Sequence, residues 1–172
     1  PLRHGSELPG ELIALLQKDL CGDSHWKYHA GVSYRNLLIF RSRGAAAPFS
    51  TETNSTPPHD ITGQATRPHL PSGPGSDELL RLMERSRELF ADAAPNLARL
   101  QAGQFAATQT WLWGLGQRPS LQPFAERYGV RGAVITAVDL LRGMGRLIGW
   151  QVIDVEGATG YLDTDYAAKG RA

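Results

Sequence analysis

The stretch that decides the fold covers residues 111–169 and reads WLWGLGQRPSLQPFAERYGVRGAVITAVDLLRGMGRLIGWQVIDVEGATGYLDTDYAAK. Two short runs rich in Val and Ile, residues 133–136 and 152–155, have the composition of strands. Residues 138–149 between them repeat apolar side chains at helical spacing. A strand, a helix and a strand with short connections predict a βαβ unit with parallel strands.

The helix predicted over residues 138–149 has a distinct apolar face. Leu141, Met144 and Ile148 are expected to point inward. Gly143 and Gly145 would let a neighbouring element approach this helix closely, because glycine carries no side chain.

Other elements surround this unit. Residues 110–113 are expected to form a strand, in which Trp111 and Trp113 alternate and pack into the core. A short helix is expected over residues 123–128. Another begins at residues 163–166, where Asp and Thr side chains would cap its first turn.

The sequence upstream of this unit predicts a different arrangement of helices and strands. Residues 10–20 show helical spacing, and aromatic and β-branched residues predict strands at roughly 25–29 and 33–42. The apolar run of residues 37–40 suggests that the second strand is central in its sheet. Residues 43–75 are rich in Pro, Thr, Ser and Gly, which predicts a long loop that is functional or disordered.

A longer helix follows this loop. Ser76 is the expected N-cap, and the next two residues are acidic and favour the positive end of the helix. The buried stripe comprises Leu79, Leu82, Met83, Leu89 and Phe90. Pro95 should interrupt the helix, with a second one at about residues 96–102.

Composition narrows the functional classes. The chain has 172 residues, 41% hydrophobic residues and a formal net charge of +1, which provides no basic surface for nucleic acid or for an anionic membrane. The single cysteine, Cys21, excludes an internal disulfide and a cysteine-rich zinc site, and is typical of a reducing cytoplasm. The sequence contains neither an apolar run long enough for a membrane helix nor the pattern of a signal peptide.

Four motifs in fixed order carry a family resemblance. They are Trp-Leu-Trp-Gly-x-Gly before a Pro-containing loop, Tyr-Gly-x-x-Gly-Ala-x-Ile, an Arg-Gly helix, and Gly-Ala-Thr-Gly-x-x-Asp-Thr. The sequence resembles archaeal-type cofactor-independent phosphoglycerate mutases over residues 26–64 and 106–172, with GVSYRNLLIF and TPPHDITG as the upstream matches.

The resemblance implies an α/β fold. An α+β insert domain, residues 1–105 with the long loop 43–75, would join a βαβ segment of an alkaline-phosphatase-like core, residues 106–172. The family converts 3-phosphoglycerate to 2-phosphoglycerate through a phosphoserine and two divalent metals (manganese, magnesium or zinc). Its serine and most metal ligands belong to other segments, so this chain is expected to hold no metal.

Both ends of the chain are expected to be cut, because it lacks an initiator Met and stops just after the start of a predicted helix. We therefore expect a fragment that is inactive when isolated. Residues 109–172 are expected to dimerise, rearrange or remain partly disordered, because strands taken from a parallel sheet leave exposed edges.

Four residues are the candidates for binding the small phosphorylated substrate. Arg35 and Arg118 offer planar bidentate donors for phosphate or carboxylate, although each could be a solvated surface arginine. His59 and Asp60 follow Pro57-Pro58 in the long loop and could orient the glycerate or the phosphoryl group. The structural alternative is an Asx-turn in which Asp60 caps the next residues.

Other polar positions have stronger structural readings. The turn of residues 157–160 follows a strand and should face the site, although its Asp and Thr neighbours are good helix caps. Arg142 and Arg146 share a helix face and are expected to be solvated or to lie between domains, with anion binding as the alternative.

Two other functions remain open at this point. A phosphatase or a homoserine-kinase-like paralogue would share the scaffold. A non-catalytic binding or regulatory module would use the small α+β domain without chemistry.

Overall fold

The computed structural model describes residues 8–20, 25–31, 34–41, 44 and 46–172, with side chains from Gly10 onward. The chain divides into two compact units, residues 1–116 and 117–172. The predicted division after residue 105 falls inside the first of them. The elements, in chain order, are α1 (Leu8–Leu20), β1 (Trp26–His29), β2 (Leu37–Phe40), η1 (Pro58–Ile61), η2 (Arg67–His69), α2 (Ser76–Ala91), α3 (Ala94–Gln101), α4 (Phe124–Tyr128), β3 (Ala133–Val134), α5 (Asp139–Leu147), β4 (Gln151–Val152) and α6 (Tyr166–Arg171).

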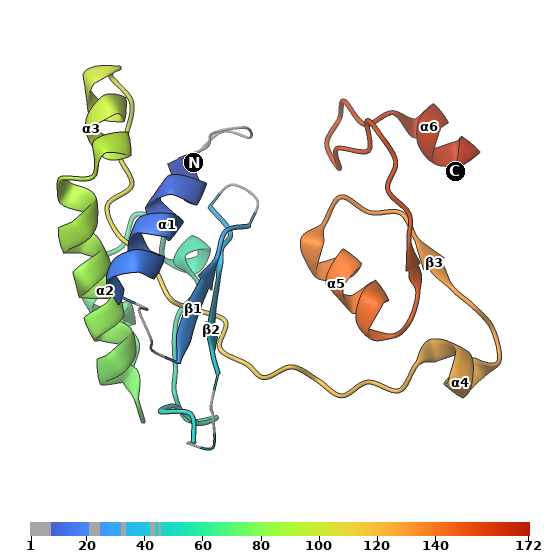
Figure 1. The fold of residues 1–172 in the computed structure, drawn as a ribbon, viewed down its shortest axis with the longest axis horizontal. Helices are drawn as coiled ribbons and strands as arrows, with labels where there is room; N and C mark the ends of the chain where they lie inside the picture. The colour runs from blue at the N-terminus through green and yellow to red at the C-terminus, as the bar shows by residue number, and fades with distance from the viewer. Residues whose placement is uncertain (1–7, 21–24, 32–33, 42–43, 45) are drawn as a thin grey trace. The chain divides into compact units, whose positions relative to one another are not determined.

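In the first unit, α1 and α2 pack together beside the β1–β2 hairpin (Figure 1). The core joins one face of each element, as the helical spacing predicted. Its buried members are Leu12, Ile13, Leu16, Trp26, Tyr28, Leu79, Leu82, Phe90 and Ala93. Arg85 of α2 also binds both carboxylate oxygens of Asp19 in α1 at 3.0 Å, which fixes the two helices in register.

The two strands of the first unit pair antiparallel, with Trp26 opposite Phe40 and His29 opposite Leu37. The expectation that the second strand is central was wrong, because the sheet has two strands within the described residues. Leu38 and Phe40 pack against the core, whereas Leu37 is 57% exposed. The apolar run therefore serves a single packed face, and it does not indicate burial on both sides.

The start of α2 also differs from the prediction. Gly75, with φ +74°, is the N-cap, and Ser76 is already helical and buried. A Cβ at Gly75 would lie 2.0 Å from the carbonyl oxygen of Pro48, so this position requires glycine. After α2 ends, Pro95 lies inside the first turn of α3, where a missing N–H costs no helical hydrogen bond.

The long loop is ordered where the structure describes it. It contains the 3-10 helices η1 and η2, and Asn54 and Ser72 form an antiparallel bridge that brings its two limbs together. Thr53 closes the same limbs, because its hydroxyl donates to the carbonyl oxygen of Pro74 at 2.6 Å. The loop is therefore a closed structure that presents η1 at a defined place.

The second unit contains the predicted βαβ arrangement, as Figure 1 shows for β3 and α5. β3 and β4 pair in parallel through Ala133–Gln151 and Val134–Val152, and both strands are shorter than expected. Gly145 is the buried contact point of α5, and a Cβ there would lie 2.9 Å from the Cγ1 atom of Val134. The expected close approach is confirmed at Gly145.

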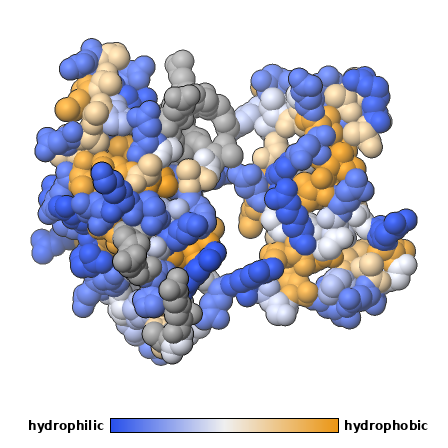
Figure 2. Space-filling model, viewed as in Figure 1, coloured by the Kyte–Doolittle hydropathy of each residue, from blue (hydrophilic) through white to orange (hydrophobic). Residues whose placement is uncertain are grey.

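The predicted inward face of α5 was wrong in part. Leu141 and Met144 are exposed, and a Cβ at Gly143 would meet open space. The reason is that α5 touches the two strands mainly through Gly145, and no further described element of the second unit covers its apolar stripe. Figure 2 shows apolar residues reaching the surface of this unit. Across the described residues, no helix is both long and apolar enough to be a membrane span.

Candidate functional site

The turn that carries His59 and Asp60 is η1. Pro57 is extended at its N-cap, and Pro58 occupies the first helical position, where its fixed φ suits the turn. The backbone N–H of Asp60 donates to the carbonyl oxygen of Pro57 at 3.1 Å. Ile61 is buried beneath the turn, so the turn is anchored while the side chains of His59 and Asp60 are exposed.

The Asx-turn at Asp60, which was the structural alternative to a binding role, is not formed. The turn is closed instead by Thr62, whose hydroxyl donates to the carbonyl oxygen of His59 at 3.3 Å, and by Gln64, whose amide donates to the carbonyl oxygen of Asp60 at 3.2 Å. Within the described residues, the Asp60 carboxylate has no hydrogen bond or ion pair. It is therefore available to a ligand.

The imidazole of His59 contacts the indole of Trp113. The ring centroids are 5.0 Å apart and the planes are perpendicular, an arrangement that aromatic pairs favour. Trp111 is fixed to the same loop, because its Nε1–H donates to the carbonyl oxygen of Thr56 at 2.8 Å. Two tryptophans thus attach residues 111–113 to the segment that leads into η1.

The predictions for residues 110–113 were wrong in two respects. The segment pairs with no described strand, so it forms no ladder. Leu112 and Leu115 pack against the core, whereas Trp111 is half-buried and Trp113 is 44% exposed.

Buried polar side chains support the tryptophan segment from below. Ser86, fully buried in α2, accepts hydrogen bonds from the N–H and the hydroxyl of Thr110 at 2.8 and 2.9 Å. Asn96, 1% exposed, donates to the carbonyl oxygen of Ala107 and accepts from its N–H. These polar groups are satisfied by the segment itself, so they specify where it runs.

Arg35 lies between β1 and β2, two residues before β2 begins. Its guanidinium is 5.6 Å from the ring centre of Tyr34, which is exposed. Arg35 is exposed and forms no hydrogen bond or ion pair with the described residues. No contact within these residues joins Arg35 to His59 or Asp60.

Arg118 belongs to the second unit, in a stretch without helix or strand, and its side chain is exposed. The structure therefore brings His59 and Asp60 together on one turn of the first unit, and both Arg35 and Arg118 have exposed side chains.

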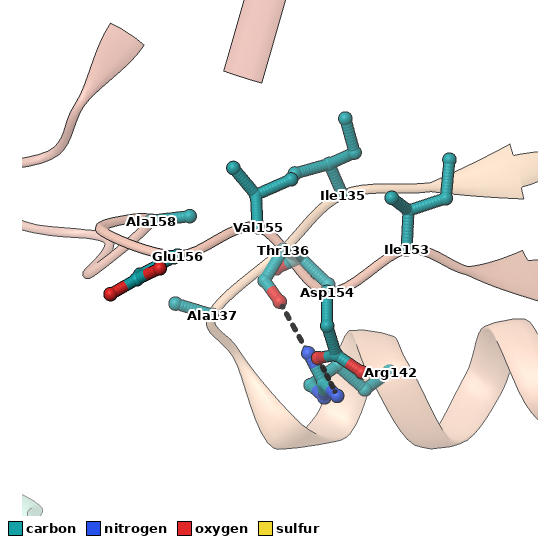
Figure 3. A pocket seen from close by; sticks show the side chains of 9 residues that line it. All are labelled: Ile135, Thr136, Ala137, Arg142, Ile153, Asp154, Val155, Glu156 and Ala158. Carbon is teal, nitrogen blue, oxygen red and sulfur yellow. Dashed lines mark hydrogen bonds and ion pairs between the residues drawn. The ribbon is translucent and has the colours of Figure 1, made fainter. Parts of the chain in front are cut away.

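The second unit has its own pocket at the carboxyl ends of β3 and β4, where sites in parallel sheets lie. Its volume is about 480 Å³. Figure 3 shows Arg142 reaching into it, where the guanidinium binds the carbonyl oxygen of Thr136 and the carboxylate of Asp154. Of the two arginines on α5, Arg142 is thus half-buried in an ion pair, whereas Arg146 is exposed.

The glycine turn after β4 is closed on itself. Thr159 donates to Asp163 at 2.6 Å, and the buried Thr164 accepts from the N–H of Gly160 at 2.9 Å. Asp165 caps α6, because its carboxylate accepts from the N–H of Ala168 at 2.8 Å. These side chains are consumed by local bonds, as the structural reading of this turn expected.

The residues that the structure describes do not fit a metal ion. Nowhere among them do three or more His, Cys, Asp or Glu side chains gather as ligands. His59 and Asp60 form a pair without further ligands.

Sequence reasoning missed the two tryptophans and their buried supports, Ser86 and Asn96, as parts of the site. Trp111 and Trp113 were assigned to the core because aromatic alternation is typical of a packed strand. No local signal identifies them, because the hydrogen bond of Trp111 to Thr56, for example, joins residues 55 positions apart.

Comparison with known proteins places this geometry in a family. The sequence model of the 2,3-bisphosphoglycerate-independent phosphoglycerate mutase family matches residues 3–96, more than half of the chain. A 2,3-bisphosphoglycerate-independent phosphoglycerate mutase 2 from Methanothermobacter thermautotrophicus is 48% identical over 161 residues, which are 93% of this chain. A probable enzyme of the same name from Geobacter sulfurreducens is 41% identical over 92% of the chain.

The chain spans 38% of the length of each of these two relatives. Among solved structures, the cofactor-independent phosphoglycerate mutase of Thermoplasma acidophilum superposes with a TM-score of 0.56 and 21% identity. That match covers 91% of this chain and 43% of the other, and it supports the α/β fold. By its match to the family model over more than half its length, the chain belongs to the 2,3-bisphosphoglycerate-independent phosphoglycerate mutase family.

Proposed function

We propose that this chain supplies the substrate-contacting loop of a phosphoglycerate mutase that interconverts 3-phosphoglycerate and 2-phosphoglycerate. The full-length enzyme would transfer the phosphoryl group through a phosphoserine, with two divalent metals bound near it. The serine and most of the metal ligands are proposed to lie outside this chain. Residues 1–105 would be the insert domain, and residues 106–172 part of the phosphatase-like core.

One observation carries this proposal beyond family membership. His59 and Asp60 stand side by side on an anchored turn, and neither side chain is used by a hydrogen bond within the described residues. In a loop that exists only for structure, the Asp would cap the turn, and here Thr62 and Gln64 close it. Polar side chains held in place and left unused are what a binding site requires.

The proposed contacts follow from the chemistry of the substrate. 3-Phosphoglycerate carries a phosphate, a carboxylate and one free hydroxyl. The imidazole N–H of His59 would donate to a phosphate oxygen, and the Asp60 carboxylate would accept from the hydroxyl. Arg35 and Arg118 are proposed to pair with the anionic groups, since guanidinium matches both phosphate and carboxylate.

The reaction balances as two phosphoryl transfers. The serine oxygen would attack phosphorus, the bond from phosphorus to O3 would break, and the serine proton would pass to O3. In the second transfer, O2 of glycerate would attack the phosphoserine and release the serine, which regains a proton from that hydroxyl. His59 would hold the phosphoryl oxygens in both transfers. No step draws on a metal ligand from the described residues, since these do not fit a metal.

The test uses the full-length protein that contains this segment, assayed with 3-phosphoglycerate for the formation of 2-phosphoglycerate. His59→Gln is expected to lower kcat/KM by about 10²-fold. His69→Gln in the same loop is the matched control and should leave kcat/KM within about threefold. Release of inorganic phosphate without 2-phosphoglycerate would favour the phosphatase alternative. Unchanged activity of the His59→Gln variant would contradict the proposed role.

A further inference from the structure

Residues 111–113 carry two large rings that contact the long loop. Leu112 and Leu115 of the same segment pack against the core. Trp111 reaches the carbonyl oxygen of Thr56, and Trp113 reaches the imidazole of His59. The contacted residues, Thr56 and His59, are three positions apart on the loop. The tryptophan segment therefore touches both the approach to η1 and the candidate substrate-binding side chain.

The segment that carries the two tryptophans is held in place by buried side chains of α2 and α3. Thr110, immediately before Trp111, is held by two hydrogen bonds to the fully buried Ser86. Ala107, three residues earlier, is held by the buried Asn96. The segment that leads into Trp113 is thus held by α2 and α3, in addition to its contacts with the loop.

The orientation of the His59 side chain depends on its contact with Trp113 in this segment. The His59 side chain is exposed, and within the described residues it has no hydrogen bond that would select a rotamer. The perpendicular contact with Trp113 at 5.0 Å is the interaction that restricts it. An imidazole already held in one orientation loses less conformational freedom when it binds an anion.

We propose that Trp113 is a positioning residue, which fixes the imidazole of His59 for a phosphorylated three-carbon acid. Trp111 holds the approach to η1 through its hydrogen bond to the carbonyl oxygen of Thr56. The binding part of this inference rests on the proposed function, whereas the orientation of the imidazole stands on the contacts alone.

The orientation is tested in the 172-residue chain by NMR of the histidine side chains, with His59 assigned from the spectrum of His59→Gln. The indole ring current should move the His59 ring resonances away from their positions in a short peptide. Trp113→Leu should return them to the peptide positions. Trp113→Phe should retain part of the displacement, because it keeps an aromatic ring at the same place. Peptide-like His59 resonances in the wild type would overturn the proposal.

Binding is measured in the full-length protein that contains this segment, by titrating 3-phosphoglycerate against the same resonances. We expect Trp113→Leu to raise Kd about three- to tenfold, and Trp113→Phe to raise it less than about threefold. In a His59→Gln background, Trp113→Leu should cause no further loss, because it acts through the imidazole. Equal Kd values for Trp113→Leu and wild type, or an additive loss in the double variant, would overturn it.

The proposed function and the positioning role of Trp113 can be contradicted independently. If 3-phosphoglycerate shifts no His59 resonance while Trp113→Leu still abolishes the ring-current displacement, the proposed function is contradicted and the positioning of the imidazole is supported. Amide spectra of α1 and α2 that match the wild type show that the variants are folded.

Discussion

The two units of this chain bury their apolar residues to very different degrees. The first unit has a continuous core in which Leu16 and Leu82 are fully buried. In residues 117–172, all of which the structure describes, the buried positions are Gly145 and Thr164. Leu140, Leu141 and Met144 of α5 are exposed. Burial of large apolar side chains therefore stabilises the first unit, whereas in the second unit the large apolar side chains are at most half-buried.

This difference explains why the candidate loop has a defined shape. The buried side chain of Ile61 anchors η1. The hydrogen bonds of Trp111 to Thr56 and of Thr110 to Ser86 connect the loop to the core. Parallel strands are normally covered on both faces, and the two-residue ladder of β3 and β4 is a minimal version of that arrangement. A substrate-contacting side chain is better placed on the unit that has a core.

The largest expected effect is in the core of the first unit. Leu82→Ala should lower the free energy of unfolding by about 2–5 kcal/mol, because Leu82 is fully buried in α2 and truncation leaves a cavity. Leu140→Ala in α5, where the side chain is 71% exposed, should change it by less than about 0.5 kcal/mol. Urea unfolding followed by circular dichroism measures both. Similar losses in the two variants would mean that the second unit has a comparable core.

A smaller effect is expected at the close contact of the second unit. Gly145→Ala places a methyl group 2.9 Å from the stiff side chain of Val134, and should cost about 1–3 kcal/mol. Gly143→Ala adds the same methyl group to the same helix in open space, and should be neutral or stabilise by up to about 1 kcal/mol. Hydrogen exchange of the α5 and β4 amides reports the change. A neutral Gly145→Ala variant would disprove the close packing of α5.

The predictable parts of the fold are the periodic ones. Residues 10–20 and the stripe of α2 follow from apolar spacing, since each buries one face against a neighbour in the same unit. The helix of the βαβ unit was also predictable, but its inward face was not. Spacing shows that Leu141 and Met144 form an apolar stripe, and it does not show whether an element covers that stripe.

The sequence predicts His59 and Asp60 as site residues because two prolines precede two polar side chains, and their role stays a prediction. The role of Trp113 was not predictable, because it depends on a contact between residues 54 positions apart, which no local pattern encodes. The same holds for Gly75: its requirement comes from the carbonyl oxygen of Pro48, a long-range neighbour that only the fold reveals.

The smallest expected effect concerns a charge on the first unit. Hydrogen bonds from Arg81, its positive charge, and the N–H of Trp26 lower the pKa of Glu78 below the ordinary value of 4.5. A lowered folded-state pKa adds stability above pH 4.5 that is lost as the pH falls through the folded value. Glu78→Gln should therefore cost about 0.5 kcal/mol at neutral pH, and the difference should vanish in acid. A difference that persists unchanged in acid would assign the effect to packing.

The central prediction is that the first unit, which has a hydrophobic core, holds the substrate-contacting loop. Hydrogen exchange of the 172-residue chain, with and without 3-phosphoglycerate, tests it most directly. Without ligand, the amides of α1 and α2 should exchange much more slowly than those of α5 and β4. With ligand, protection should increase at residues 57–64, and His59→Gln should remove that increase. Slower exchange in α5 than in α2, or ligand protection confined to residues 117–172, would contradict the account.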